Sequence, residues 1–241
     1  MTALHPTAET SEIFYPTSDG EPVAETFDHL YALLVTLEVL RQYMQGRRAT
    51  VLGNQFLYYA QGFPRLRTAP DVMVIFEVEP GGRDNYKIWE EGQVPSVIFE
   101  MTSPGTRNQD EGFKKTLYEQ LGVEEYWQFD PRGEWIAEQL RGYRLRGEIY
   151  EPITDSQSDL LQLRVAVEGR VLGFYRLDTG EKLLIPEEMA IALRQETIAR
   201  QEAEQARQEA EATAAQQRQR AEELAALLDR YRQQFGELPE D

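Results

Sequence analysis

The sequence contains no cysteine and only two histidines, His5 and His29. The absence of cysteine excludes disulfides, iron–sulfur clusters, thiolate zinc sites and cysteine nucleophiles. Two histidines also exclude a site with three or more imidazoles in one chain. Any metal site must therefore be built mainly from oxygen ligands, which suit Mg²⁺, Mn²⁺ or Ca²⁺.

Long apolar runs are missing as well. The longest nearly apolar stretch, residues 30–40, includes Thr36 and Glu38, and a helix needs about 20 apolar residues to span a bilayer. Residues 1–10 lack the basic start and apolar run of an export signal. We therefore expect a soluble, cytoplasmic protein with no membrane partner.

Basic residues are scarce: 25 Lys and Arg stand against 42 Asp and Glu, for a net charge of −17. A broad basic face for non-specific nucleic-acid binding is therefore not expected. A site that carries a divalent metal brings its own positive charge, however. The acidic balance thus leaves a nucleic-acid substrate possible.

The 241 residues are 41% hydrophobic and 10% aromatic, enough for one sizeable domain with an appendage. The character of the sequence changes at Pro186, because residues 187–234 contain no glycine or proline and are rich in Ala, Glu, Gln and Arg. These residues favour helix. We predict an N-terminal segment over 1–19, one domain over 20–186 and a helical tail over 187–241.

The tail shows a weak heptad pattern. Its members recur at spacings of three and four: Ala210, Ala214, Gln217, Ala221, Leu224, Leu228, Tyr231 and Phe235. Such a pattern favours a coiled coil and hence a homodimer. The alternative is a single solvated helix with many charge pairs, since alanine is a poor residue for a coiled-coil seam.

The domain over residues 20–186 is predicted to be α/β. Helices are predicted over residues 25–44 and 110–121, the second ending at Gly122. Strands are predicted over residues 49–52, 55–60, 71–78, 95–102, 125–130, 143–145, 149–153, 161–167 and 171–175. This order predicts a central mixed sheet flanked by helices.

Three charged residues lie on or beside elements that read as buried. Asp71 opens an apolar strand, Glu100 lies near the end of another, and Lys114 is on the helix that follows. Burying a carboxylate is costly unless it is paired or bound to metal. Two carboxylates and a lysine suit metal-assisted phosphodiester hydrolysis. The alternative is structural: Asp71 caps a turn, and Glu100 and Lys114 are solvated.

Several ordered segments carry a family resemblance. They are residues 20–26 (GEPVAET), 69–72 (APDV), 99–106 (FEMTSPGT), 122–127 (GVEEYW) and 129–131 (FDP), with Asp110, Lys114 and Tyr118 at four-residue spacing. In this order they resemble the Uma-two family, a branch of the PD-(D/E)XK nuclease superfamily described as "putative restriction endonucleases". A long charged C-terminal helix is similar to that of many members.

The resemblance implies a restriction-endonuclease-like fold and metal-dependent DNA cleavage. Asp71 matches the aspartate of the PD motif and Glu100 matches the second acidic residue, both metal ligands, with the backbone carbonyl of Met101 completing the set. Thr102 stands where the superfamily usually has its lysine, and a hydroxyl cannot supply that charge. Lys114 matches a lysine that has moved to the following helix.

Three residues are possible accessories. Glu25 matches an acid before the first helix, which either holds a metal-associated water or stabilises the helix N-terminus. Tyr118 lies one turn after Lys114 on the same helix face, where packing or support of the site is the simpler role. Thr102, on the same strand face as Glu100, completes this accessory group.

The leading hypothesis is a Mg²⁺-dependent (or Mn²⁺-dependent) endodeoxyribonuclease acting on DNA. The alternative is a nuclease-fold protein that no longer cuts and acts as a binding or assembly module through its C-terminal helix, since fold alone does not establish function. A small-molecule hydrolase is disfavoured, because only His29, on the first helix, could pair with a nucleophile.

Overall fold

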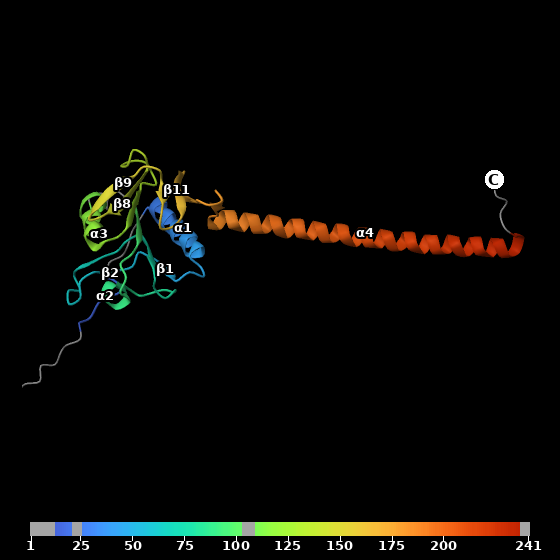
Figure 1. The fold of residues 1–241 in the computed structure, drawn as a ribbon, viewed down its shortest axis with the longest axis horizontal. Coiled ribbons are helices and arrows are strands. Elements are labelled where there is room, and N and C mark those ends of the chain that lie inside the picture. Colours follow the sequence, from blue (N-terminus) through green and yellow to red (C-terminus); the bar gives the residue numbers. More distant parts are fainter. Residues whose placement is uncertain (1–12, 21–25, 103–108, 237–241) are drawn as a thin grey trace, which may run out of the picture. The chain divides into compact units, whose positions relative to one another are not determined.

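A computed structural model describes residues 13–20, 26–102 and 109–236 of the chain. The chain divides into two compact units, Met1–Pro186 and Glu187–Asp241. Figure 1 shows the strands and shorter helices gathered in the first unit and a single long helix in the second. Each unit is described by itself.

The first helix, α1, spans Phe27–Tyr43. It begins where the Thr26 side chain accepts a hydrogen bond from the backbone N–H of His29 at 3.3 Å, an N-cap that satisfies one of the donors left free at a helix start. Its buried residues include Ala32, Leu33 and Leu40. These residues pack into the core, whereas the apolar side chains of Phe27, Leu30 and Leu34 are exposed.

A six-stranded mixed sheet forms the centre of the first unit, with the order β1-β4-β6-β7-β8-β9. The strands are β1 (Ala49–Gly53), β4 (Val72–Phe76), β6 (Val97–Met101), β7 (Glu125–Phe129), β8 (Leu140–Arg146) and β9 (Ile149–Ile153). Only the β6–β7 pair is parallel among these neighbours. The predicted fold class, a mixed central sheet flanked by helices with a long C-terminal helix, is confirmed.

Each face of this sheet has its own core, because side chains alternate along a strand. Val72 and Val74 of β4 pack in the cluster that contains α1. Met73 and Ile75 pack in the cluster that contains Leu117 and Tyr118 of the helix α3 (Lys115–Leu121). The α1 side is also covered by a four-stranded sheet of β10 (Gln157–Ser158), β11 (Leu163–Glu168), β12 (Val171–Arg176) and β13 (Lys182–Leu183).

The predicted helix over 110–121 has two parts. A π-helical turn, η1, spans Gln109–Lys114, and α3 spans Lys115–Leu121. The helix ends at Gly122, whose φ of 84° is the left-handed cap expected there. Several short elements were not predicted: β3 (Arg67–Thr68), β5 (Tyr86–Lys87) and α2 (Ile88–Glu91), of which β3 and β5 flank β2 (Leu57–Tyr58) in a small sheet.

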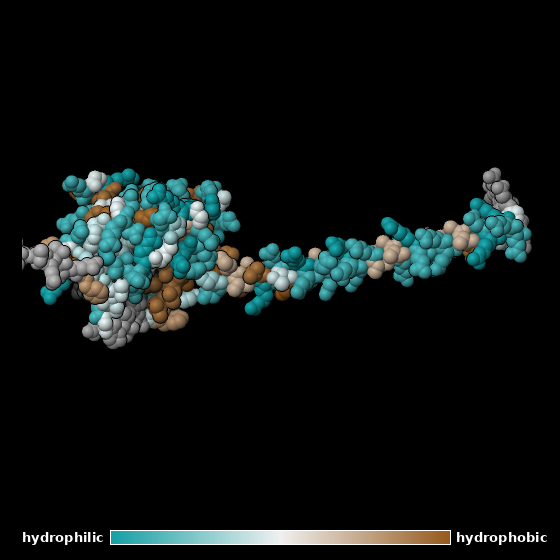
Figure 2. Space-filling model, turned by 90° about the horizontal axis from the view of Figure 1, so that it is seen from below, coloured by the Kyte–Doolittle hydropathy of each residue, from teal (hydrophilic) through white to brown (hydrophobic). Residues whose placement is uncertain are grey.

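The second unit is a helix, α4, that begins at Pro186 and ends at Phe235. Hydrophilic residues predominate along it (Figure 2), and nearly all its described side chains are exposed. Its large apolar residues lie near its two ends, in residues 189–198 and 224–231. Among the residues that the structure describes, no helix combines the length and apolarity that crossing a membrane requires.

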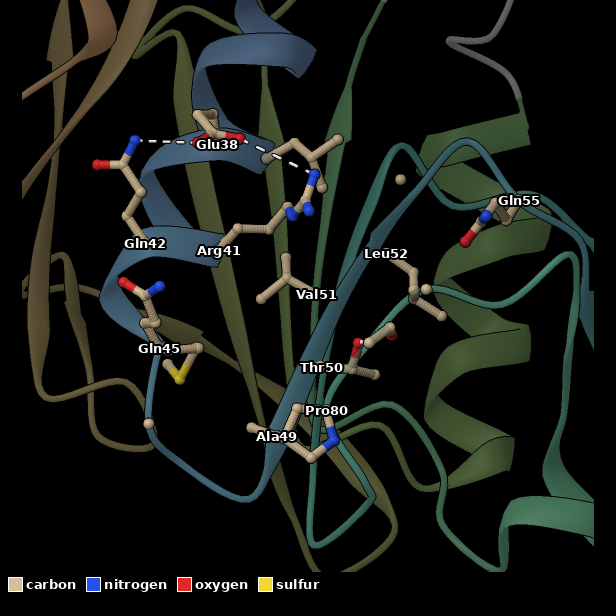
Figure 3. Close-up of a pocket in the computed structure, with 16 residues that line it drawn as sticks. Glu38, Arg41, Gln42, Gln45, Ala49, Thr50, Val51, Leu52, Gln55 and Pro80 are labelled. Atoms are coloured by element: carbon tan, nitrogen blue, oxygen red, sulfur yellow. Dashed lines mark hydrogen bonds and ion pairs between the residues drawn. The ribbon is translucent and has the colours of Figure 1, made fainter.

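A groove runs beside β1, between the second half of α1 and residues 80–82 (Figure 3). Glu38 on its α1 wall bonds to Gln42 at 3.0 Å and approaches Arg41 at 3.9 Å. Its lining includes none of Asp71, Glu100 and Lys114. The predicted site residues therefore lie outside this groove.

Candidate active site

The predicted acidic residues lie at the edge of the sheet where β4 begins and β6 ends. Val72 of β4 pairs with Phe99 of β6 in antiparallel register, so the next positions along are Asp71 and Glu100. Asp71 contacts His29 of α1, whereas Glu100 contacts Lys114 and Tyr118, and Tyr118 belongs to the core on the other face of the sheet. Asp71 is 8% exposed and Glu100 is 1% exposed, so both carboxylates are withdrawn from water.

Asp71 is tied to the end of β6 and faces α1. Its Oδ2 accepts a hydrogen bond from the backbone N–H of Met101 at 2.6 Å. Its Oδ1 lies 3.6 Å from Nε2 of His29 in the first turn of α1. The charge-assisted bond to a strand amide fixes the carboxylate, which explains how an aspartate is tolerated at this buried position.

Both oxygens of Glu100 are engaged by the helix that follows β6. Lys114 Nζ lies 2.8 Å from Oε2, and Tyr118 Oη donates to Oε1 at 2.6 Å. Lys114 and Tyr118 are one helical turn apart and therefore share a face. The Lys114 side chain is only 11% exposed, so this pair is a buried ion pair with a second hydrogen bond.

Tyr118 is fully buried. Burial raises the pKa of its phenol well above the usual value, and the adjacent Glu100 charge and hydrogen bond raise that pKa further. A hydrogen bond with Thr68 acts in the opposite direction on the pKa. The phenol therefore remains a hydrogen-bond donor to Glu100 over the working pH range.

Thr102 lies just beyond β6 and is 3% exposed. Its backbone N–H donates to Phe129 O at 2.7 Å, and among the residues that the structure describes its hydroxyl has no hydrogen-bond partner. It borders a small cavity that is also lined by His29, Arg132 and Trp135. The predicted accessory residue Glu25 lies outside the described residues.

The oxygen atoms at this edge suit a hard divalent cation. Two carboxylates and the backbone carbonyl of buried Met101 are anionic or neutral oxygen donors. An ionised carboxylate has about four acceptor positions, so the bonds from Lys114 and Tyr118 leave Glu100 with further capacity. Within the described part of the chain, no three His, Asp or Glu side chains cluster closely enough to form a metal site by themselves.

Two features of this site were missed by the sequence prediction. The approach of His29 to Asp71 brings in a residue that had been placed only on the first helix, and the bond from Tyr118 goes directly to a proposed ligand. The four-residue spacing of Lys114 and Tyr118 is the signal that could have paired both with Glu100. No comparable signal marks His29, because contact between a helix start and a distant strand end depends on the tertiary fold.

Comparisons with known proteins identify the family of the chain. No curated protein matches the chain. A solved structure described as a "putative nuclease belonging to DUF820" from Anabaena variabilis ATCC 29413 is similar at 16% sequence identity, with a TM-score of 0.43, covering 67% of this chain and 80% of that one. A family model described as "Putative restriction endonuclease" matches residues 3–174, a span that includes Asp71, Glu100 and Lys114. This match over most of its length shows that the chain belongs to the Uma2 family.

Proposed function

We propose that the protein is a metal-dependent DNA endonuclease that hydrolyses phosphodiester bonds. The observation that carries this proposal is that two buried carboxylates, Asp71 and Glu100, lie at the ends of neighbouring strands, with the Lys114 ammonium 2.8 Å from Glu100. Membership of the Uma2 family supports the same reaction class.

In this proposal Asp71, Glu100 and the Met101 carbonyl hold Mg²⁺ or Mn²⁺. When bound, the cation polarises the phosphate and acidifies a water molecule. The Met101 amide holds Asp71, and Tyr118 holds Glu100, so that both carboxylates are oriented before substrate arrives. Because the net charge of the chain is −17, we do not expect a broad basic surface that attracts DNA. In this proposal the attraction comes from the charges at the site itself.

Lys114 has the role that Thr102 cannot fill. The threonine hydroxyl is uncharged, whereas the ammonium of Lys114 has three donors. One of these contacts Glu100, and in this proposal the ammonium also faces a phosphate oxygen or the attacking water once substrate is bound. Lys114 therefore offsets the negative charge that develops on the phosphate as the bond breaks.

The test is plasmid cleavage by the purified full-length chain with Mg²⁺, with Mn²⁺ and with EDTA. We expect metal-dependent nicking or linearisation that is lost in Asp71→Ala and in Lys114→Ala but retained in Lys115→Ala, a neighbouring lysine that does not contact Glu100. Thermal unfolding gives a second measurement, since a cation that binds only the folded state raises Tm. That rise should disappear in Asp71→Ala.

A folded wild-type chain that cleaves nothing with either cation would contradict this function. The alternative would then stand: a nuclease-fold protein that acts as a binding or assembly module through α4. A Tm rise that persists in Asp71→Ala would place the cation elsewhere on the chain.

The tail supports a second element of the proposal, self-association as a homodimer through residues 187–235. Leu224, Leu227, Leu228 and Tyr231 of α4 are between 42% and 64% exposed, and they form a stripe at helical spacing. The structure thus adds Leu227 beside the predicted seam. The side chain of Phe235 lies outside the described residues. A dimer would bring two active sites to one duplex.

A further inference from the structure

A hairpin beside the candidate site differs in charge from the rest of the chain. Residues 57–68, from the start of β2 to the end of β3, form this hairpin, which we call the β2–β3 arm. It belongs to a stretch, residues 39–70, that contains five arginines and no aspartate or glutamate, although the whole chain has 42 acidic and 25 basic residues. The arm itself carries Arg65 and Arg67. It is therefore a local positive element in an acidic protein, which favours contact with a polyanion.

The arm is anchored at the candidate active site. The side chain of its last residue, Thr68, makes a hydrogen bond with Tyr118, and Tyr118 Oη donates to Glu100 at 2.6 Å. Asp71 follows Thr68 by three residues. Phe63, at the tip, is five residues from Thr68, and an extended strand rises about 3.4 Å per residue, so the two lie at most about 17 Å apart. DNA bound at the site would therefore pass the tip within about five base pairs.

The tip of the arm is fixed by hydrogen bonds. Phe63 N–H donates to Ala60 O at 3.3 Å, and Leu66 N–H donates to Phe63 O at 2.9 Å. The hydroxyl of Tyr15, from the segment before α1, accepts a hydrogen bond from the Gly62 amide at 2.6 Å. A tip that is already ordered loses little conformational entropy when it binds a partner.

Two side chains of this ordered tip are open to water. Phe63 is 62% exposed, and Arg65 is exposed and makes no hydrogen bond, ion pair or cation–π contact with the residues that the structure describes. Arg67 differs, because its guanidinium lies 4.1 Å from the ring centre of Phe56 and donates to Tyr58 Oη at 3.3 Å. Arg67 thus stabilises the arm itself. An exposed ring beside an exposed guanidinium suits a nucleic acid, since the ring stacks on a base and the guanidinium bonds to a phosphate.

We infer that the β2–β3 arm binds DNA beside the cleaved bond, an inference that rests on the proposed nuclease function. Arg65 contacts a backbone phosphate, and Phe63 stacks on a base that has left the helical stack. Basic residues are scarce in this chain, so stacking supplies binding energy that few phosphate contacts provide. Because unstacking a base costs free energy, the arm favours DNA in which one base is already unpaired.

Fluorescence anisotropy measures the arm separately from cleavage. The full-length chain, in EDTA and at low salt, is titrated into a labelled, fully paired duplex and into the same duplex with one unpaired adenine. We expect the wild type to bind the second duplex more tightly. Phe63→Ala should weaken that binding roughly 5–150-fold, the range for one base–aromatic stack, and should remove the preference. Phe63→Trp should retain it.

Arg65→Ala has a different expected signature. It should weaken binding to both duplexes, and the slope of log K against log salt concentration should fall in magnitude by about 0.9, the value for one phosphate contact. Phe63→Ala should leave that slope unchanged, because it removes no charge. The controls are Arg146→Ala and Ile149→Ala, at exposed positions beside the turn between β8 and β9, which should change neither the affinity nor the slope.

Binding that Phe63→Ala and Arg65→Ala both leave unchanged, or a wild type that binds neither duplex, would overturn the role of the arm. Plasmid cleavage by the wild type with Mg²⁺ or Mn²⁺ would in that case still establish the nuclease function. Conversely, a wild type that binds DNA through Phe63 and Arg65 and cleaves nothing would overturn the nuclease function and leave DNA binding by the arm standing.

Discussion

Glu100 shows how the site keeps a charge in the protein interior. It is 1% exposed, and it remains compatible with burial because Lys114 balances its charge and Tyr118 satisfies its other oxygen. A fully paired buried carboxylate adds little net stability, but removal of its partner leaves an uncompensated charge. The ion pair is therefore sensitive to substitution of either residue.

Lys114→Met should destabilise the fold because it retains the apolar stem of the side chain and removes the charge. Breaking a buried ion pair in this way costs about 3–5 kcal/mol. Urea unfolding followed by tryptophan fluorescence measures the change in the free energy of unfolding. We also expect millimolar Mg²⁺ or Mn²⁺ to stabilise Lys114→Met more than the wild type, since the cation supplies the missing positive charge.

Lys115→Met is the matched control for this variant. Lys115 lies over the ring of Tyr143, with Nζ 4.0 Å from the ring centre, and it contributes the cation–π energy of a partly exposed pair, about 0.5–1 kcal/mol. Equal losses in the two variants would contradict the ionic role of Lys114, because its charge would then contribute no more than a partly exposed cation–π contact.

At the scale of single residues, the sequence predicted three charged site residues but not all of the side chains that contact them. Asp71, Glu100 and Lys114 could be found because each lies at a fixed position in a strand or helix pattern. The contact between His29 and Asp71 joins residues 42 positions apart in the chain, and local periodicity carries no information about such a pair. Their assigned roles in cleavage remain predictions.

At the scale of elements, Asp28 connects α1 to two distant segments. It accepts hydrogen bonds from Arg132, after β7, and from Arg170, in the turn between β11 and β12. The Arg170 hydrogen bond is the largest cause of a lowered Asp28 pKa, and Arg132 lowers it further against the opposing effect of burial. The Asp28 carboxylate thus connects the start of α1 to the segment after β7 and to the turn between β11 and β12.

Asp28→Asn should lower Tm near neutral pH and have little effect in acid. The pKa of Asp28 is depressed below its ordinary value of 3.8 in the folded chain. Its contribution to stability is therefore fully present above pH 3.8 and is lost as the pH falls through the lower folded value. Thermal unfolding of wild type and variant across pH 7 to 2 measures the difference.

Asp155→Asn provides the control, because Asp155 caps a local exposed turn by accepting a hydrogen bond from the Gln157 amide. A Tm difference between Asp28→Asn and the wild type that stays constant down to pH 2 would contradict the ionic role of Asp28. It would then indicate that the loss comes from packing or hydrogen bonding alone.

Helices and strands were predicted from the sequence where the apolar pattern was long, and they were missed where it was short. The helix before β1 and the strands β4, β6 and β7 carry sustained apolar patterns, and the predicted and observed elements overlap. The strands β3 and β5 have two residues each, too few to show an alternation. The π-helical turn over Gln109–Lys114 depends on an i to i+5 bonding pattern that helix propensity does not distinguish.

At the scale of the whole molecule, α4 has no core of its own. Fifty residues of helix would be about 75 Å long, and its composition explains why it is helical without explaining what it contacts. Polar residues cover most of it, but Leu224, Leu227, Leu228 and Tyr231 gather in its last turns. An exposed apolar stripe with a polar surround is typical of a surface that associates.

Removal of residues 187–241 should convert a dimer into a monomer at micromolar concentration. Sedimentation equilibrium gives the mass of both forms directly. In the full-length chain, Leu224→Gln together with Leu228→Gln should produce the same dissociation, because each places an amide in a seam that excludes water. Ala212→Gln, an exposed position off that seam, should leave the mass unchanged.

Cleavage assays on the same proteins connect the tail to the chemistry. If two sites act on one duplex, the dimer should linearise plasmid in a single encounter, whereas the truncated monomer should accumulate nicked circles before linear product. A full-length chain that is monomeric at micromolar concentration contradicts the coiled-coil proposal. A truncated chain that stays dimeric moves the interface into the first unit, and since α4 would then be dispensable for pairing, its apolar stripe would have to bind another partner.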